Sequence, residues 1–160
     1  MKDTNRARDP LVLLVEDDPA HACLLTAAVA ETGVRARIER VKNAEEAEER
    51  LSDLSKERPA LILVDLNLPG KSGREFLVGI KRDPRLQSLP VVVLSCSQAP
   101  EDVAACYRAN ANAYLVKPFT WEDLLRTVQV TLEFWLGVAV APPARRESEG
   151  SVLRGRPAGR

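Results

Sequence analysis

The sequence has few of the residues that build zinc sites and disulfide frameworks. Its 160 residues include one histidine, His21, and three cysteines, none of which has Cys-x-x-Cys spacing. An odd number of cysteines without that spacing supports neither a disulfide framework nor a Cys/His zinc site. Any metal site is therefore expected to consist of oxygen ligands.

Long apolar runs and an excess of one charge are also absent. Unbroken apolar runs such as Leu11–Val15 and Val91–Leu94 are far shorter than the roughly 18 residues of a membrane-spanning helix. Residues 1–9 are polar and lack the apolar core of a signal peptide. The 23 basic and 23 acidic residues cancel, which argues against binding nucleic acid or a membrane through net charge. We expect a soluble, cytoplasmic protein that binds neither.

The length predicts one domain followed by a chemically distinct tail. Apolar residues make up 45% of the chain and charged residues 29%, as in globular domains. Residues 142–160 hold five arginines, two glutamates and only two large apolar residues, too few to offset the entropy of ordering. We expect a polar segment at 1–9, a folded domain at 10–141 and a disordered basic tail at 142–160.

Short apolar runs alternate with helical patterns, which predicts an α/β fold. The segments 11–15, 60–64 and 91–94 are continuously apolar, as central strands covered on both faces should be. The segments 35–41 and 113–116 are weaker or shorter and suit edge strands. Helices are expected at 19–32, 43 to about 56, 73–82, 100–109 and 120 to about 136. Five strands and five helices in alternation predict a doubly wound parallel sheet.

Reactive residue types follow the predicted strands where each one ends. They are Glu16-Asp17-Asp18, Asp65, Ser95 and Lys117-Pro118. The carboxyl ends of parallel strands lie at one edge of the sheet, so these groups should gather there. Clustered carboxylates repel one another unless a cation neutralises them, and an oxygen ligand set suits Mg²⁺. Asp65 is then the candidate nucleophile for phosphoryl transfer through an acyl phosphate.

Four motifs resemble the receiver domain of bacterial two-component response regulators over residues 10–137. They are Val15-Glu-Asp-Asp-Pro19, Val64-Asp-Leu-Asn-Leu-Pro-Gly70 with Gly73, Leu94-Ser95, and Tyr114-Leu-Val-Lys-Pro-Phe119. The stretch from Ile80 to Ser97 more narrowly resembles the single-domain regulators that accompany bacterial phytochromes. The resemblance implies a flavodoxin-like sheet with strand order 2-1-3-4-5. It also implies a sensor histidine kinase, with a phytochrome-type photoreceptor as a candidate, as the phosphoryl donor.

The resemblance assigns chemical roles residue by residue. Asp65 matches the phosphoacceptor, and Glu16 and Asp17 match the acidic pair at the metal, with Asp17 as the most direct ligand. Asn67 should lend its backbone carbonyl to Mg²⁺. Lys117 should pair with the phosphoryl group.

The resemblance also assigns a switch. Ser95 should hydrogen-bond the phosphoryl group, and Tyr114 should rotate inward when it does. Asn67 and Ser97 should tune the lifetime of the phosphoaspartate. Pro118 should follow a cis peptide bond.

Three residues near these motifs have structural interpretations. Asp18 precedes Pro19 and is a good N-cap for the helix that follows. His21 lies in the first turn of that helix, where we expect it to be exposed and without a role in phosphotransfer. Asn110 stands where the family has glycine, and Asn tolerates a left-handed helix end.

The main expectation is a regulator that is no enzyme beyond its own phosphorylation and dephosphorylation, acting on an unknown downstream protein. A transcription factor is not expected, because residues 142–160 are too few for a helix-turn-helix domain. A Mg²⁺-dependent phosphohydrolase would need a second aspartate two residues after Asp65, where Asn67 stands. A phosphate sink without a downstream target is a further alternative.

The end of the last predicted helix is more apolar than one buried face requires. Residues 134–141 are almost wholly apolar. We expect the surplus to form a symmetric homodimer interface with Trp135 and Leu136 near its centre. Alternatively, Gly137 ends the helix and residues 138–141 fold back onto the same domain.

Overall fold

The computed structural model describes residues 9–141. The expectations for residues 1–8 and for the basic tail at 142–160 lie outside these residues. Among the helices of the described part, none is both long enough and apolar enough to cross a membrane.

Five parallel strands form a single sheet in the order β2-β1-β3-β4-β5, as predicted. The strands are β1 (Leu11–Val15), β2 (Arg37–Val41), β3 (Leu61–Val64), β4 (Val91–Ser95) and β5 (Ala113–Val116). The three central strands are buried along their whole length, whereas the two edge strands are partly exposed. Continuously apolar runs therefore became the central strands, because helices cover both faces there.

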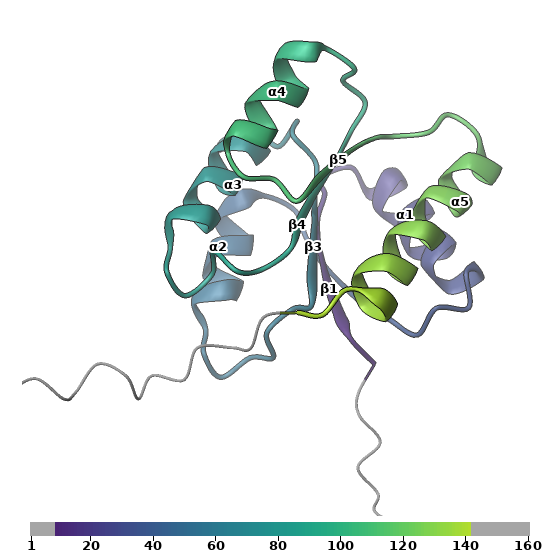
Figure 1. Ribbon diagram of the computed structural model, residues 1–160, viewed down its shortest axis with the longest axis horizontal. Helices are drawn as coiled ribbons and strands as arrows, with labels where there is room; N and C mark the ends of the chain where they lie inside the picture. The colour runs from purple at the N-terminus through teal and green to yellow at the C-terminus, as the bar shows by residue number, and fades with distance from the viewer. Residues whose placement is uncertain (1–8, 142–160) are drawn as a thin grey trace, which may run out of the picture.

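Helices cover both faces of the sheet. They are α1 (Pro19–Glu31), α2 (Ala44–Ser52), α3 (Gly73–Arg82), α4 (Pro100–Arg108), α5 (Trp121–Leu132) and the π-helical segment η1 (Glu133–Val138). Figure 1 shows α1 and α5 on one face of the sheet, and α2, α3 and α4 on the other. The predicted doubly wound architecture is confirmed.

Alternate residues of each strand enter two separate cores. In β1, Leu13 and Val15 join the core under α2, α3 and α4, whereas Val12 and Leu14 join the core under α1 and α5. This division follows from the two-residue period of a strand, which sends successive side chains to opposite faces. Both cores consist of apolar side chains, so the polar side chains of the central strands are left at their ends.

Side-chain caps fix where the helices begin. The Asp18 carboxylate accepts the backbone N–H groups of Ala20 and His21 at 2.7 and 3.3 Å. Asn43 and Thr120 cap α2 and α5 in the same way. The predicted N-caps are confirmed, and each holds a helix start beside the carboxyl edge of the sheet.

Two helix ends differ from the prediction. Helix α2 stops at Ser52 instead of near residue 56, because Asp53 is extended and its carboxylate accepts the N–H and O–H of Ser55 in a local turn. The last helix leaves α-helical geometry after Leu132 and continues to Val138 as η1. Gly137 lies in this segment, where its low helix propensity weakens a regular end.

The end of α4 has the conformation predicted for it. Asn110 has a φ of 64°, and its N–H donates to the carbonyl of Tyr107 at 2.9 Å. Asparagine tolerates this left-handed conformation better than most residues. The chain thereby turns from α4 into β5.

Candidate functional site

Three buried ionisable side chains meet at the carboxyl edge of the sheet. Glu16 follows β1, Asp65 follows β3 and Lys117 follows β5, with exposed fractions of 1%, 7% and 8%. The Lys117 ammonium donates to Glu16 Oε2 at 2.7 Å and to Asp65 Oδ2 at 2.6 Å. The sequence prediction that these groups gather is confirmed. Their contact places a positive charge between two buried carboxylates.

The two carboxylates hold the lysine in its charged form. Burial alone would lower the pKa of Lys117, but its hydrogen bonds to Asp65 and Glu16 outweigh burial and raise that pKa above its ordinary value. The ammonium in turn compensates carboxylates that would be costly to bury unpaired. This pocket therefore stabilises a cation.

The carboxylate of Asp65 is held from both sides. Its Oδ1 accepts the backbone N–H of Asn67 at 3.0 Å, while Oδ2 accepts from Lys117. The Asp65 backbone N–H donates to the Val15 carbonyl at 3.1 Å, which ties it to β1. These contacts give the carboxylate a defined orientation.

Gly73 lies directly against the backbone of Asp65. A Cβ atom at Gly73 would lie 1.9 Å from the Asp65 carbonyl oxygen and 2.8 Å from its carbon. Only glycine allows the start of α3 to approach the backbone of Asp65 this closely. Gly73 belongs to one of the four sequence motifs, but the sequence alone did not predict this contact.

Asp17 differs in its surroundings from Glu16. It is exposed, and its backbone carbonyl accepts from Arg40 Nη2 at 2.8 Å. Arg40 Nε also donates to the Glu16 carbonyl at 3.0 Å, so this arginine of β2 fastens the loop between β1 and α1. The sequence reading did not single out Arg40, whose only signal was its place in a charged edge strand. Asp17 stays a predicted metal ligand.

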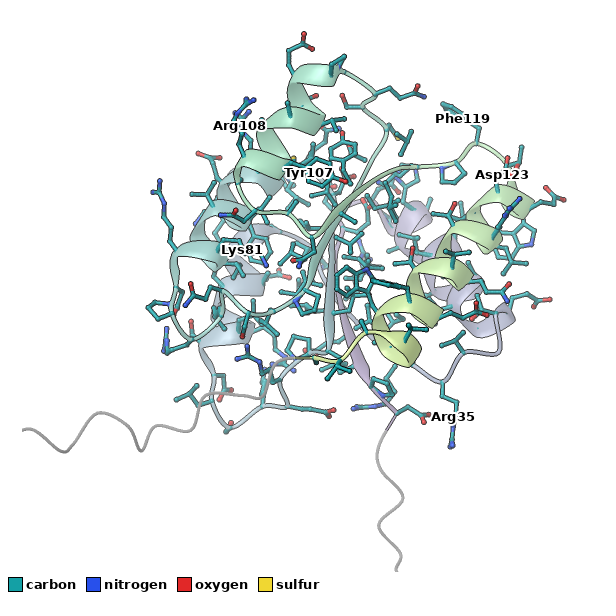
Figure 2. The ribbon with its side chains drawn as sticks, viewed as in Figure 1. Arg35, Lys81, Tyr107, Arg108, Phe119 and Asp123 are labelled. Carbon is teal, nitrogen blue, oxygen red and sulfur yellow. The ribbon has the colours of Figure 1, made fainter. Side chains whose placement is uncertain are left out.

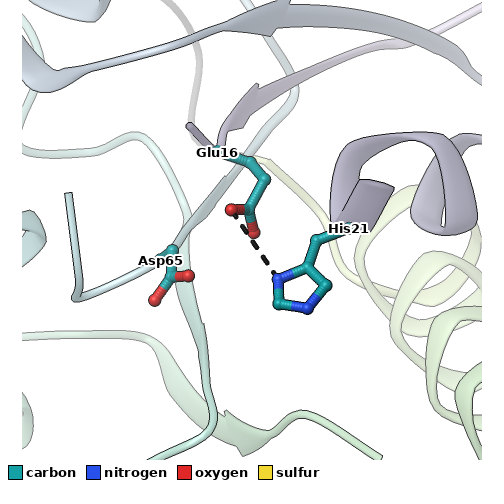
Figure 3. A group of neighbouring side chains, drawn as sticks. All are labelled: Glu16, His21 and Asp65. Atoms are coloured by element: carbon teal, nitrogen blue, oxygen red, sulfur yellow. Dashed lines mark ion pairs between the residues drawn. The ribbon is translucent and has the colours of Figure 1, made fainter. Parts of the chain in front are cut away.

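His21 belongs to the site, which the sequence reading did not predict. Its Nδ1 lies 3.3 Å from Lys117 Nζ and 4.0 Å from Glu16 Oε1. Figure 3 shows its ring turned from α1 towards Glu16 and Asp65. His21 is half-buried, and Asp18 caps α1 so that the first helical turn brings residue 21 back over the sheet edge. The capping motif was the available signal.

Carboxylate and imidazole donors at this edge fit a divalent cation. One ligand atom each from Glu16, His21 and Asp65 lies within 4.8 Å of the others. Carboxylate oxygens suit Mg²⁺. Asn67 is exposed and its N–H donates to Asp65 Oδ1, and its backbone carbonyl stays a predicted ligand. This cluster differs from the expected oxygen-only ligand set in one atom, because the turn of α1 brings a nitrogen of His21 beside the two carboxylates.

Ser95, Ser97 and Tyr114 form a hydrogen-bonded chain beside the site. Ser95 is fully buried, and its Oγ accepts the Ser97 N–H at 3.2 Å. The Tyr114 hydroxyl donates to the Ser97 carbonyl at 2.8 Å. The Ser97 hydroxyl donates to Asp102 of α4 at 2.6 Å. These hydrogen bonds connect β4, β5 and α4.

The expected cis bond before Pro118 is not found. All peptide bonds of residues 9–141 are trans, including the one between Lys117 and Pro118. The trans form is favoured even before proline, by roughly 0.5–1 kcal/mol. Lys117 reaches both carboxylates with this trans bond.

The apolar surplus near the C-terminus is divided between buried and exposed side chains. Trp135 and Leu136 are half-buried against the core under α1 and α5. Phe134, Val138 and Val140 have exposed fractions of 49%, 72% and 95%. Val138 and Val140 therefore do not pack onto the domain, which contradicts the alternative that residues 138–141 fold back onto it.

Comparison with known proteins identifies relatives with similar sequences. "Probable methanogenesis regulatory protein FilR2" of Methanothrix harundinacea is 41% identical over 139 residues, which cover 84% of this chain and 90% of FilR2. The response regulator Rcp1 of Synechocystis is 48% identical over 87 residues, 54% of this chain and 59% of Rcp1.

Solved structures of response regulators have the same fold as this chain. The phosphorylated cyanobacterial phytochrome response regulator RcpA superimposes with a TM-score of 0.78 at 38% identity, covering 84% of this chain and 99% of RcpA. The Mn²⁺-bound form of Rcp1 gives a TM-score of 0.77 at 36% identity with the same coverage. The response regulator receiver domain model matches residues 12–129, from β1 into α5. The chain therefore belongs to the receiver-domain family of response regulators.

Proposed function

We propose that this chain accepts a phosphoryl group from a sensor histidine kinase on Asp65. An oxygen of the Asp65 carboxylate attacks the phosphorus of the phosphohistidine, a P–O bond forms and the P–N bond breaks. The imidazole of the kinase leaves with the electron pair of that bond and takes up a proton. Hydrolysis of the resulting acyl phosphate returns the carboxylate and releases inorganic phosphate.

The observation that carries this proposal is the position of the Asp65 carboxylate. It is 7% exposed, and Lys117 and the Asn67 N–H hold its two oxygens. The Lys117 ammonium can donate to the phosphoryl oxygens in place of the carboxylate once negative charge has built up there. Glu16 and Asp17 would hold Mg²⁺ together with Asp65, and the bound ion would neutralise the carboxylates and the incoming phosphate.

Asp65→Asn tests the acceptor, because an amide is a poor nucleophile at the same position. We expect the full chain with Mg²⁺ to form an alkali-labile phosphoprotein from acetyl phosphate or a histidine kinase, and the variant to form none. Asp123→Asn is the matched control, since this exposed aspartate lies in the first turn of α5 (Figure 2). Labelling of the Asp65→Asn variant at the wild-type level would contradict the proposal.

The same assay separates the phosphoacceptor from the other functions considered. Removal of Mg²⁺ by EDTA should abolish labelling, because the carboxylates of the site would repel the phosphate. Steady release of phosphate from a phosphomonoester, at many turnovers per chain, would instead indicate a phosphohydrolase.

The donor is proposed to be a phytochrome-type histidine kinase. The likeness to RcpA, whose structure is described as a phytochrome response regulator, supports this choice. Phosphotransfer profiling against all histidine kinases of the source organism tests it. Preferential transfer from kinases without a phytochrome-type sensor would overturn it.

Ser95 and Tyr114 are proposed to transmit the phosphorylation to the surface. The Tyr114 hydroxyl already bonds to the Ser97 carbonyl in the loop between β4 and α4, so movement of this loop would move the tyrosine. Asn67 and Ser97 flank the acceptor and are proposed to tune phosphoaspartate lifetime. Substitutions there that left the lifetime unchanged would contradict this role.

The output surface is proposed to include a homodimer interface at the last helix. Phe134, Val138 and the half-buried Trp135 and Leu136 lie on η1, with Val130 exposed one turn before them. Phe134 and Trp135 contact each other edge to face, with ring centroids 5.0 Å apart. Exposed apolar side chains of this density are typical of interfaces between copies.

A further inference from the structure

One side chain of the site has no part in the proposed phosphotransfer. His21 is the only histidine of the chain, and its Nδ1 faces the pocket that contains Glu16, Asp65 and Lys117 (Figure 3). Its nearest acidic neighbours are Glu16 Oε1 at 4.0 Å and Asp18 Oδ2 at 3.8 Å. The ring is half-buried, so one side of it contacts the site and the other side is open to solvent.

The lysine ammonium marks where the pocket holds a cation. It lies 2.7 Å from Glu16 Oε2, 2.6 Å from Asp65 Oδ2 and 3.3 Å from His21 Nδ1. An ammonium group has only donors, so a hydrogen bond between Lys117 Nζ and His21 forms in the tautomer whose Nδ1 carries a lone pair. Two carboxylate oxygens and one imidazole lone pair therefore converge on a single positive charge.

The spacing of these donors is close to what a divalent cation needs. One ligand atom from each residue lies within 4.8 Å of the others. Ligands on opposite sides of a cation with bonds of about 2.1 Å are about 4.2 Å apart. Small side-chain rotations that move the ligand atoms by a few tenths of an ångström would bring them to the spacing that a bound cation needs.

We propose that His21 is a nitrogen ligand for the divalent cation of this site and shifts its selectivity from Mg²⁺ towards Mn²⁺, Co²⁺ and Zn²⁺. The inference rests on the proposed function only in that the same carboxylates hold the cation. Mg²⁺ prefers oxygen ligands, whereas imidazole suits the first-row transition metals. A nitrogen donor therefore adds affinity for those metals and little for Mg²⁺.

Metal-binding titrations on the tag-free full chain test the selectivity. MnCl₂, CoCl₂ and MgCl₂ are titrated separately into wild type, His21→Leu and His21→Asp. We expect His21→Leu to weaken Mn²⁺ and Co²⁺ binding about tenfold or more, and Mg²⁺ binding by less than about twofold. His21→Asp offers an oxygen ligand instead and should favour Mg²⁺ relative to wild type.

Electron spin echo spectroscopy of bound Mn²⁺ tests the ligation directly. With one histidine in the chain, a ¹⁴N imidazole coupling in the wild type can come only from His21. The coupling should vanish in His21→Leu. The double variant His21→Leu, Leu24→His is the matched control, because Leu24 is a 48% exposed residue one turn further along α1. This double variant again contains one histidine, but its Mn²⁺ spectrum should show no ¹⁴N coupling.

Absence of the ¹⁴N coupling in wild type, or equal weakening of Mn²⁺ and Mg²⁺ in His21→Leu, would overturn the inference. Either result would assign His21 to positioning Lys117 alone. The wild-type spectrum decides even if a variant folds poorly. Phosphorylation of Asp65 is measured separately, so normal labelling without nitrogen ligation refutes this inference only, and nitrogen ligation without labelling refutes only the phosphoacceptor.

Discussion

Lys117 is the residue on which the metal-free site depends most. Its ammonium compensates two carboxylates that are almost inaccessible to solvent, and removal of one partner from such a buried group leaves uncompensated charge. We therefore expect the lysine to contribute to stability as well as to the proposed phosphotransfer. Two predictions at the residue scale follow from this double role.

Lys117→Met should destabilise the metal-free protein by about 3 kcal/mol at neutral pH, because Glu16 and Asp65 then repel each other in a buried site. Urea unfolding in EDTA measures the free energy of unfolding. Saturating Mg²⁺ should recover most of the loss. A variant as stable as wild type in EDTA would contradict this account of the pocket.

The contribution of Lys117 should disappear at alkaline pH. Its folded-state pKa is raised above the ordinary value of 10.5, so the folded chain holds this proton more tightly than the unfolded chain. The stabilisation is complete below the ordinary pKa and is lost as pH rises through the folded one. The difference in unfolding free energy between wild type and Lys117→Met in EDTA should therefore narrow above pH 10.5. A constant difference would argue against the raised pKa.

At the scale of elements, the start of α3 determines where Asp65 lies. The Ser72 hydroxyl accepts the Glu75 N–H, and the Glu75 carboxylate accepts the Ser72 N–H, so a capping box defines this start. Gly73 is the first residue of the helix and contacts the Asp65 carbonyl. The helix start and the backbone of Asp65 are therefore packed directly against each other.

Gly73→Ala should cost about 3 kcal/mol of stability, because its Cβ would lie 1.9 Å from the Asp65 carbonyl oxygen. It should also slow phosphorylation by displacing the acceptor. Gly79→Ala in the same helix is the control, since only the ends of the Glu48 and Lys71 side chains lie near. That change should stabilise the chain by up to about 1 kcal/mol. Equal thermal unfolding of both variants would contradict the close approach.

The strands and helix starts were predictable because they depend on local chemistry. Continuous apolar runs gave β1, β3 and β4, and N-cap residues such as Asp18 and Thr120 gave the helix starts. The end of α2 was misjudged because the turn at Asp53 competes with the helical pattern. The change to η1 was not predicted either, because the apolar periodicity continues from α5 through Trp135.

The carboxylates and lysine of the site were predictable from strand order, since Glu16, Asp65 and Lys117 each follow a strand. His21 was not, because it reaches the pocket through the rotation of α1 and not through its place at a strand end. Its contact depends on three-dimensional geometry that one sequence does not contain.

At the scale of the whole molecule, self-association is the property that the exposed surface predicts. We expect a dimer at tens of micromolar, dissociated by the double change Phe134→Glu and Val138→Glu, which puts charge on exposed positions of η1. Sedimentation measures the mass. Leu54→Glu is the control, since this residue is 72% exposed and belongs to the connection between α2 and β3.

A monomeric wild type, or a dimer unaffected by both glutamates, would refute the interface. Trp135→Glu and Leu136→Glu would be less decisive, because both side chains are half-buried and also support the domain's own core.

The long sequence separation within the site has a consequence for protein synthesis. Lys117 bonds to residues 52 and 101 positions earlier in the chain. At about 5–20 residues per second, a ribosome needs roughly 3–10 s to proceed from the acceptor to the lysine. Until then, a nascent chain contains Asp65 and Glu16 without their ammonium partner. The buried charge cluster can therefore assemble only after the last strand of the sheet has been synthesised.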